Sequence, residues 1–505
     1  MKPQEHRALG VAVSSAALVN LGGDSGEPFL LSFGDVVALS GDFFIADGAP
    51  IHSCPGVDAG AEAQPSEGLF ELAAVPGDRG QAPATRDEIV CALKVMSVDQ
   101  RLVDPRFEPG GQFGNYNFSS TASETEVERR VRDRFLALGA SNDDHFVRPG
   151  PRGPATSGDR PAARFGSAPR AYRRLHERAL DQAWQLGRDG GGISHAMARE
   201  AAAQHYLTDA FAAGHLRTPV AAIREFWQAK YPEFWEGLRR KVASDTVDAL
   251  RELTAPLRML PTSFLYGRTL QAVRARTRGF PRISLGDLLA KVFHDYDNTH
   301  GLTLEGGGRL FGDGCLDQGL TRELALAAVR AGVDDVEVAL TLGASGKSSS
   351  GEALYRAVRQ VTGAPAEQFV AETKIPKASR DNPPQNWQGP DVEALWESPI
   401  VGTRGTTVGE AVTEALELGQ ELPRRLDCLA HGAVDFVGLS QIPALREWVV
   451  GKACQAYRRG FLRNLTTDPK GTVLACLSDH HLDITVPPPG MVREEVVAQG
   501  SSQTE

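Results

Sequence analysis

The sequence predicts a mainly α-helical fold with long loops, and three observations support this prediction. Apolar residues recur at helical spacing along much of the chain, whereas strictly alternating strand patterns are scarce. Capping residues such as Thr85 and Ser123 precede acidic first turns. The 53 glycines and 31 prolines among 505 residues indicate long connections between the helices.

Each predicted helix follows from its apolar pattern and from the residues at its boundaries. Pro232 is expected to interrupt the fifth of them, because proline removes a helix hydrogen bond. The predicted helical ranges are 85–102, 123–140, 172–186, 198–211, 224–254, 284–296, 320–342, 350–362, 407–429 and 442–464.

The chain is longer than one ordinary hydrophobic core requires, so we expect more than one domain. A first domain is predicted over residues 1–330, with a flexible, low-complexity insertion at 147–169. A second helical region is predicted at 331–485, followed by a disordered tail at 486–505.

The net charge of −10 and the isoelectric point near 5.7 argue against non-specific nucleic-acid binding. Six cysteines without CxxC spacing indicate neither a disulfide framework nor a zinc ribbon. Free thiols fit a reducing compartment, so we expect a cytoplasmic protein. Residues 1–7 include basic side chains and residues 8–19 are apolar and small, a pattern typical of a signal peptide. A secreted protein is therefore the alternative to a cytoplasmic one.

The most informative motif is His205-x3-Asp209-x5-His215. Residues four apart lie on one face of a helix, so His205 and Asp209 could bind one ion from adjacent turns. His215 lies about 240° further around the helix than Asp209, so it can join them only if the helix ends first. Gly214 is the candidate break, and Pro219 disfavours continuation.

Further histidines with carboxylate neighbours extend this candidate metal site. His145 follows Asp144, and His294 precedes Asp297. Imidazole with carboxylate suits Zn²⁺ best, and Mn²⁺, Fe²⁺ or Co²⁺ are alternatives. Ligands from several helices predict more than one ion, and neighbouring ions can bridge a phosphodiester. His176, His195 and His300 are weaker candidates, and no role is expected for His6, His52, His431, His480 or His481.

The motif helix, QHYLTDAFAAGHLRTP, is similar to the metal-binding helix of the zinc-dependent phospholipase C and P1 nuclease superfamily. Together with LSFGDVVALSGDFF, SNDDHF, AYRRLHERAL and FHDYDNTHGL it resembles uncharacterised bacterial proteins assigned to that superfamily, over residues 29–330. The resemblance implies an all-helical domain that binds one to three Zn²⁺ ions, with Asp209 bridging two of them.

The resemblance also implies roles for particular residues. His145 matches a His-Phe element, and Asp35 or Asp42 matches an upstream aspartate. Asp42 or Asp144 is the expected catalytic carboxylate, positioning a zinc-bound hydroxide that attacks phosphorus. The implied metal ligands are Asp35, His145, His205, Asp209, His215, His294 and Asp297.

The sequence departs from the superfamily pattern in two places. Secreted members bind zinc through a mature N-terminal tryptophan, for which this chain offers no obvious equivalent. They also carry a His-x3-Glu/Asp pair shortly after the motif helix, whereas this chain has no histidine between His215 and His294. We expect His294, with Asp297, to fill that place after an insertion.

The implied activity is a phosphoric diester hydrolase of the phospholipase C type. Its expected substrate is a phospholipid or another phosphodiester, with peripheral membrane contact and no stable nucleic-acid complex. A P1-type nuclease is a second hypothesis, because the aromatic stretch from Phe226 to Trp235 could stack bases. A non-enzymatic helical scaffold with a structural or relict metal site is a third, and a delivered toxin or cell-envelope hydrolase is a fourth.

Overall fold

The computed structural model confirms the mainly helical fold, since helices account for 70% of the described residues and strands for 4%. The described residues are 2–14, 17–20, 30–43, 87–93, 127, 131, 138–139, 142–150, 165–254, 258–277, 282–380, 386–400, 405–418, 452–453 and 455–477.

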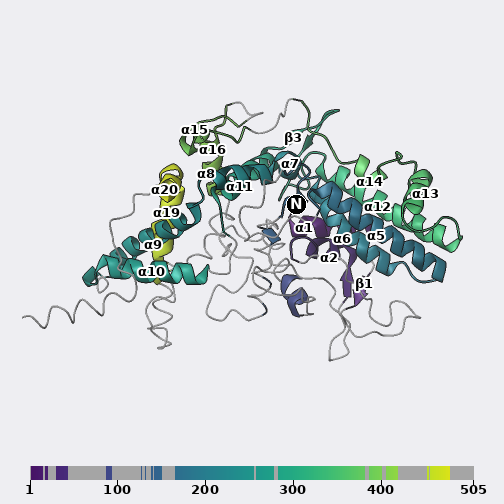
Figure 1. Cartoon of the computed structure of the whole chain (residues 1–505), viewed down its shortest axis with the longest axis horizontal. Helices are drawn as coiled ribbons and strands as arrows, with labels where there is room; N and C mark the ends of the chain where they lie inside the picture. The colour runs from purple at the N-terminus through teal and green to yellow at the C-terminus, as the bar shows by residue number, and fades with distance from the viewer. Residues whose placement is uncertain are drawn as a thin grey trace, which may run out of the picture. The chain divides into compact units, whose positions relative to one another are not determined.

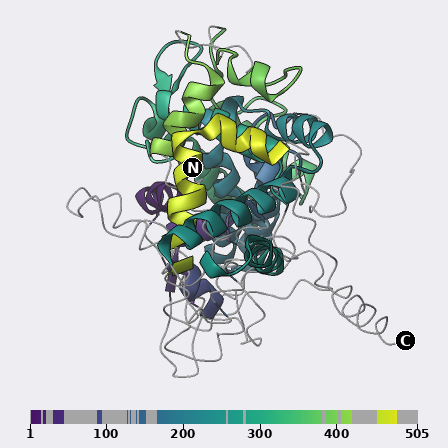
Figure 2. The same cartoon turned by 90° about the vertical axis from the view of Figure 1, so that its left-hand side faces the viewer.

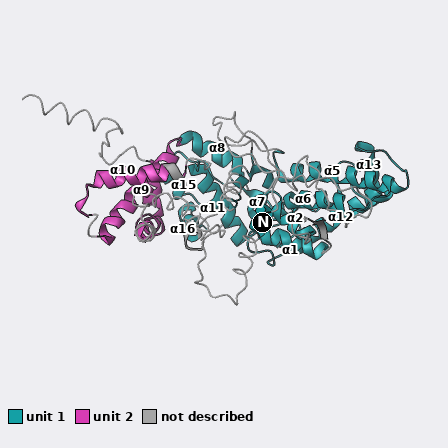
Figure 3. Cartoon of the chain, turned by 90° about the horizontal axis from the view of Figure 1, so that it is seen from below, with its two compact units in different colours: residues 1–230, 279–420 teal, residues 231–278, 421–505 magenta. Residues whose placement is uncertain are grey.

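The chain divides into two compact units, residues 1–230 with 279–420 and residues 231–278 with 421–505 (Figure 3). The first unit contains α1 (Pro3–Val13), β1 (Ala17–Asn20), β2 (Leu30–Ser32), α2 (Phe33–Leu39), the 3-10 helix η1 (Asn142–His145), α5 (Ala168–Asp189), α6 (Ser194–Asp209), α7 (Ala213–Arg217), α8 (Val220–Lys230), α11 (Leu285–His300), β3 (Leu302–Thr303), β4 (Arg309–Leu310), α12 (Thr321–Ala344), α13 (Glu352–Thr362), α14 (Val370–Thr373), α15 (Val392–Trp396) and α16 (Val408–Leu418). The second contains α9 (Phe234–Leu253), α10 (Thr262–Arg276), the π-helical turn η5 (Arg458–Leu462), α19 (Arg463–Thr467) and α20 (Pro469–Leu477).

These units differ from the domains predicted from the sequence. The predicted boundary at residue 330 falls inside α12, which belongs to the first unit along its whole length. Residues 331–420 therefore join the unit that carries the metal motif. The predicted tail at 486–505 and most of the predicted insertion at 147–169 lie outside the described residues.

Helices α5, α6, α11, α12 and α13 coincide with predicted ranges to within a few residues, and α8 and α9 together cover the predicted range 224–254. The predicted interruption is confirmed, because Pro232 lies between the end of α8 and the start of α9. The short helices α2, α7, α14, α15 and α20 were not predicted, and neither were the longer helices α1 and α10. Their apolar patterns are weak, so packing against other elements stabilises them more than periodicity does. The predicted helices 123–140 and 442–464 lie largely outside the described residues.

The first unit is built on α5, α6 and α12, which pack against one another side by side (Figure 1). Gly187 and Gly343 allow α5 and α12 to approach closely. A β-carbon on Gly187 would lie 2.0 Å from the Leu340 carbonyl oxygen, and one on Gly343 would lie 2.0 Å from the Trp184 carbonyl oxygen. The backbones therefore meet without intervening side chains.

Helices α1 and α2 cross equally closely, and α1 also packs on α12. A β-carbon on Gly10 would lie 2.6 Å from the Gly34 Cα atom. Beside this crossing, Arg7 Nε donates to Asp35 Oδ1 over 2.6 Å. Asp35 also accepts from the Ser32 amide, which completes the capping box that starts α2.

The motif helix ends where the metal motif requires a bend. Helix α6 stops at Asp209, the chain turns, and α7 begins at Ala213. The break predicted at Gly214 is therefore present but lies before that glycine. Gly214 has another role, because a β-carbon there would lie 2.4 Å from the His294 carbonyl oxygen. The glycine lets α7 lie against α11.

A buried polar cluster occupies the centre of the α5, α6 and α12 group. His176 Nδ1 donates to Glu200 Oε2 over 2.6 Å, and its Nε2 lies 3.5 Å from Asp335 Oδ2. Burial would lower the pKa of His176, but the two carboxylates outweigh it and raise the pKa to about 10. His176 therefore serves as a buried cation between two acidic groups.

In the second unit α9 packs with α10, α20 and η5. The helices of residues 452–477, yellow in Figures 1 and 2, lie against α9 in both views. Val247, Leu250, Leu265 and Ala456 form a small apolar core between these elements. None of the described helices combines the length and the apolar composition needed to cross a lipid bilayer.

Replacing Gly343 by alanine should destabilise the first unit. The added methyl group would collide with the Trp184 carbonyl oxygen and force α5 and α12 apart. Overpacking of this kind costs about 1–3 kcal/mol, which chemical denaturation measures as a lower unfolding midpoint. Gly139→Ala is the matched control, because a β-carbon there meets no atom within 4 Å. Equal losses of stability in the two variants would contradict the close crossing.

Candidate metal centre

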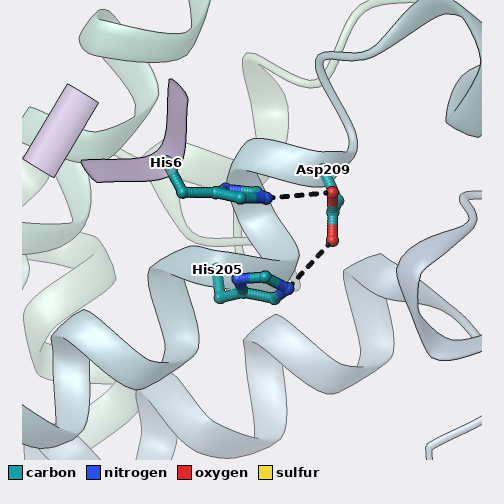
Figure 4. A group of neighbouring side chains, drawn as sticks. All are labelled: His6, His205 and Asp209. Carbon is teal, nitrogen blue, oxygen red and sulfur yellow. Dashed lines mark ion pairs between the residues drawn. The ribbon is translucent and has the colours of Figure 1, made fainter. Parts of the chain in front are cut away.

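The buried carboxylate of Asp209 lies at the centre of four histidines. Its Oδ1 is 3.3 Å from His6 Nε2 and 3.3 Å from His215 Nδ1. Its Oδ2 is 2.7 Å from His145 Nδ1 and 3.4 Å from His205 Nε2. Figure 4 shows the His6 and His205 rings side by side, each pointing at one of the two oxygens. The Asp209 side chain is 1% exposed, so this contact with imidazoles replaces contact with water.

The four histidines come from four different elements. His6 lies on α1, His145 on η1, His205 on α6 with Asp209, and His215 on α7. Only the pair His205 and Asp209 is neighbouring in the helix, at positions i and i+4. The tertiary structure brings the others together.

Three groups of described side chains place potential ligand atoms within 4.8 Å of one another. Two of the groups share His205. Because the single lone pair on His205 Nε2 can bind only one ion, we treat these two groups as one site and call it the His205 neighbourhood. The third group is separate and adjoins it through His215. The groups are His6 with His205 and Asp209, Asp42 with His145 and His205, and His215 with His294 and Asp313.

Hydrogen bonds to the protein select the tautomers of His205 and His215. His205 Nδ1 donates to the Val37 carbonyl oxygen over 3.0 Å, and His215 Nδ1 donates to the His145 carbonyl oxygen over 2.8 Å. A carbonyl can only accept, so Nδ1 carries the proton in both rings and Nε2 carries the lone pair. Metal-binding histidines are held in the same way by a partner on the second nitrogen.

His6 shows the same arrangement and gives the clearest indication of an ion. The Thr208 hydroxyl donates to the Gln204 carbonyl oxygen, so its oxygen accepts the proton of His6 Nδ1 over 2.7 Å. His6 Nε2 is then buried and makes no hydrogen bond. A buried lone pair without a donor is costly, and a metal ion would satisfy it.

His294 is oriented by its own neighbours. Its Nδ1 donates to Asp295 over 2.8 Å, and Lys291 holds that carboxylate with a 2.6 Å ion pair. Its Nε2 lies 3.6 Å from Asp313 Oδ2. Asn298 connects this group to the motif, because its Oδ1 accepts from the Gly214 amide over 2.6 Å.

The electrostatics favour neutral imidazoles around an ionised carboxylate. Burial lowers the pKa of His205 and of His215 well below the usual range, so both rings are neutral ligands at pH 7. Burial alone would raise the pKa of Asp209, but the groups that face its oxygens, the imidazoles among them, favour the ionised form and hold the pKa well below the usual value. Asp209 therefore stays ionised.

The pKa values of Asp42 and His145 are both raised above their usual values. Burial raises the pKa of Asp42 to about 6. Burial would lower the pKa of His145, but the carboxylates of Asp209 and Asp42 raise it above its usual value. Below about pH 6 Asp42 therefore holds a proton that an ion would displace.

Gly41 makes the approach of Asp42 feasible. A β-carbon on Gly41 would lie 2.2 Å from His205 Cδ2 and 3.0 Å from His145 Cε1. The residue also has a φ of +80°, a left-handed conformation that favours glycine. The turn before Asp42 can therefore lie directly against the Cδ2 and Nε2 atoms of the His205 ring.

Six of the residues predicted from the sequence do come together, and three do not. The six are Asp42, His145, His205, Asp209, His215 and His294. Asp35 is outside the three groups and pairs with Arg7 instead. Asp297, expected beside His294, accepts hydrogen bonds from Arg217, including one of 2.8 Å from Nε.

Asp144, expected as a catalytic carboxylate, is also outside the three groups. Its oxygens accept from the backbone amides of Phe165 and Gly166, with 3.1 Å from the Phe165 nitrogen to Oδ1. The carboxylate therefore binds the backbone just before α5. Asp42 is the one expected catalytic carboxylate that the structure brings to the histidines.

Two residues of these groups, His6 and Asp313, were not predicted from the sequence. His6 was given no role, yet its Nε2 lies against Asp209. Asp313 belongs to a group with His215 and His294. Asp313 follows Gly312 just as Asp42 follows Gly41, so a Gly-Asp dipeptide was the available signal. That signal does not discriminate, because Asp35 follows a glycine as well.

Comparisons with protein families, with curated proteins and with solved structures each find no match for this chain. The geometry of the described residues is therefore the basis for the functional argument.

Replacing Gly41 by alanine should abolish metal binding at the His205 neighbourhood. The new methyl group would overlap the His205 ring and displace either the ring or Asp42. Elemental analysis of dialysed protein should show less metal per chain than in the wild type. Gly190→Ala is the control, because Gly190 has a similar φ of +75° but no atom within 4 Å of an added β-carbon. Unchanged metal content in Gly41→Ala would refute this assignment.

Metal affinity should fall as the pH is lowered through about 6. Asp42 has a pKa raised to about 6, so a proton competes with the ion below that pH. One displaced proton lowers the apparent affinity about tenfold per pH unit. Calorimetric titration with Zn²⁺ at a series of pH values measures this. Asp42→Asn should bind more weakly and with a flatter pH dependence, and identical dependence in both proteins would contradict the role of Asp42.

Proposed function

We propose that this protein is a metal-dependent phosphoric diester hydrolase of the phospholipase C type, with Zn²⁺ as its metal. The observation that supports this most strongly is the buried Asp209 carboxylate among four histidines, with a second His-Asp group beside it. Two adjoining ligand sets of this kind suit chemistry on a phosphodiester better than a single structural ion.

The donor set fits zinc. It consists of imidazoles and carboxylates, and the groups contain no thiolate, unlike most closed structural zinc sites. His6, Asp42, His145 and His205 would hold one position with Asp209, and His215, His294 and Asp313 would hold the adjoining one. Bound Zn²⁺ would offset the negative charge of the phosphate and acidify a water molecule.

The chain's own residues would complete the chemistry. Asp42 has a pKa of about 6, which suits a group that accepts a proton from the attacking water near neutral pH. Phe146 stacks on the His215 ring with centroids 4.7 Å apart, so it covers one face of that ligand. The Asp209 carboxylate would stay ionised and keep the ring nitrogens of the surrounding histidines directed toward it.

A lipid phosphodiester is favoured over nucleic acid. The aromatic stretch that could have stacked bases is largely buried, with Trp227 at 0%, Phe234 at 2% and Trp235 at 6% exposure. The Trp227 indole nitrogen donates to the Trp387 carbonyl oxygen, as expected of a packing residue. The acidic net charge of −10 also disfavours a long polyanion.

The decisive experiment combines metal content with activity. Protein purified without chelator should contain zinc and hydrolyse phosphatidylcholine in preference to single-stranded DNA. His205→Ala should lose metal and activity but remain folded, which thermal unfolding measures as a retained cooperative transition. His300→Ala is the control, because His300 is on α11 but pairs with Glu414 outside the three groups.

Three results would overturn or redirect this proposal. Metal-free wild-type protein would exclude a zinc hydrolase. Preferential cleavage of single-stranded DNA would identify a P1-type nuclease instead. A His205→Ala variant that unfolds as it loses metal, from a wild type inactive on both substrates, would indicate a structural metal site in a scaffold.

A further inference from the structure

The second unit exposes an apolar tip where α9 is connected to α10. The Met259 side chain is 88% exposed, Phe264 is 50% exposed and Leu260 is 37% exposed. Large apolar residues this exposed number five among the described residues, and three of them lie within these six positions. Scattered exposed apolar residues are ordinary, but a contiguous group indicates an interaction surface. We call residues 258–264 the hairpin tip.

The hairpin tip belongs to a basic segment of the chain, in which Arg274 pairs with Glu236 of α9. Residues 258–277 contain Arg258, Arg268, Arg274 and Arg276 and no aspartate or glutamate, although the whole chain has a net charge of −10. This segment therefore has the opposite charge to the protein as a whole.

Helix α10 presents apolar and basic residues on one face. Phe264, Arg268 and Gln271 are exposed at positions i, i+4 and i+7, which align on a helix. Leu265 and Val273 are fully buried on the other side, and Leu265 joins the small core of the second unit. The exposed face is thus continuous with the apolar tip.

Hydrogen bonds hold the hairpin tip in its exposed conformation. Arg258 Nε donates to the Arg251 carbonyl oxygen over 2.8 Å, and one of its terminal nitrogens donates to the Glu252 carbonyl oxygen over 2.9 Å. Arg258 thereby caps the end of α9. The neighbouring Met259 is directed to solvent by an anchored backbone.

We propose that the hairpin tip, with the exposed face of α10, docks on the surface of an anionic phospholipid bilayer. Interfacial helices combine large apolar residues that enter the headgroup region with arginines that attract anionic lipids. The positive charge of residues 258–277 complements such a surface. The docking surface lies in the second unit, so it is independent of the metal centre and of the proposed hydrolase activity.

Two different occupants fit this surface less well. Single-stranded nucleic acid would use the arginines and the one exposed aromatic ring of Phe264, but the aliphatic Met259 and Leu260 offer it no further stacking surface. A second copy of the chain would have to accommodate the arginines of α10 against the same arginines, which is unfavourable for a symmetric contact. The bilayer alone uses both the apolar tip and the basic helix.

Vesicle co-sedimentation of the full chain tests this proposal. The probe is phosphatidylcholine vesicles with and without phosphatidylserine, and the His205→Ala background prevents consumption of lipid by any hydrolase activity. We expect binding that requires phosphatidylserine and weakens with salt. The double variant Met259→Ser, Phe264→Ser should lower partitioning about tenfold or more, because two exposed apolar side chains no longer enter the headgroup region. Arg268→Glu should remove the preference for phosphatidylserine.

Val361→Ser is the matched control, because Val361 is 62% exposed but lies on α13 in the first unit. It should bind vesicles as the parent does, and thermal unfolding should be unchanged in every variant of an exposed residue. The proposal is overturned if the parent does not sediment with phosphatidylserine vesicles, or if the tip variants bind as the parent does. If the tip variants instead lose binding to a single-stranded oligonucleotide, the surface binds nucleic acid. If they instead lose dimerisation, the surface binds a second copy of the chain.

Discussion

The interaction on which the first unit depends is the contact of one buried carboxylate, Asp209, with four histidines. A carboxylate excluded from water is costly unless cationic or metal-bound groups surround it. The four imidazoles reach it from α1, η1, α6 and α7, so those elements must meet at one point. Close backbone approach at glycines satisfies this requirement. Gly10 and Gly34 let α1 reach α2, Gly41 admits the Asp42 turn, and Gly214 brings α7 to α11.

The carboxylates that are not ligands hold the segments that carry the ligands. Asp35 pairs with Arg7, one residue after His6, and so joins α2 to α1. Asp297 binds Arg217, two residues after His215, and so joins α11 to α7. Asp144 accepts backbone amides just before α5 while its neighbour His145 faces Asp209. The acidic residues around the motif therefore form two sets. One set faces the histidines, and the other, which includes Asp35, Asp144 and Asp297, holds the segments that carry them.

The two units differ in where their chemically distinctive side chains lie. The first concentrates histidines and aspartates in a buried centre, and its ring nitrogens are held by Val37, Thr208 and Asp295. The second presents arginines and apolar side chains outward on α10. A phosphodiester in a lipid and the surface of a bilayer are chemically related targets, so the two proposals support one another while each rests on separate residues.

The sequence by itself determined what depends on neighbours in the chain. Helical periodicity identified the long helices α5, α6, α11 and α12, Pro232 marked an interruption, and the i, i+4 spacing placed His205 and Asp209 on one face. Only the tertiary structure decided which distant residues join them. Gly-Asp dipeptides at Asp35, Asp42 and Asp313 look alike locally, yet the last two face histidines and the first pairs with an arginine. Their roles depend on contacts between segments far apart in the chain, such as that of Gly41 with His205. Local sequence patterns do not determine such contacts.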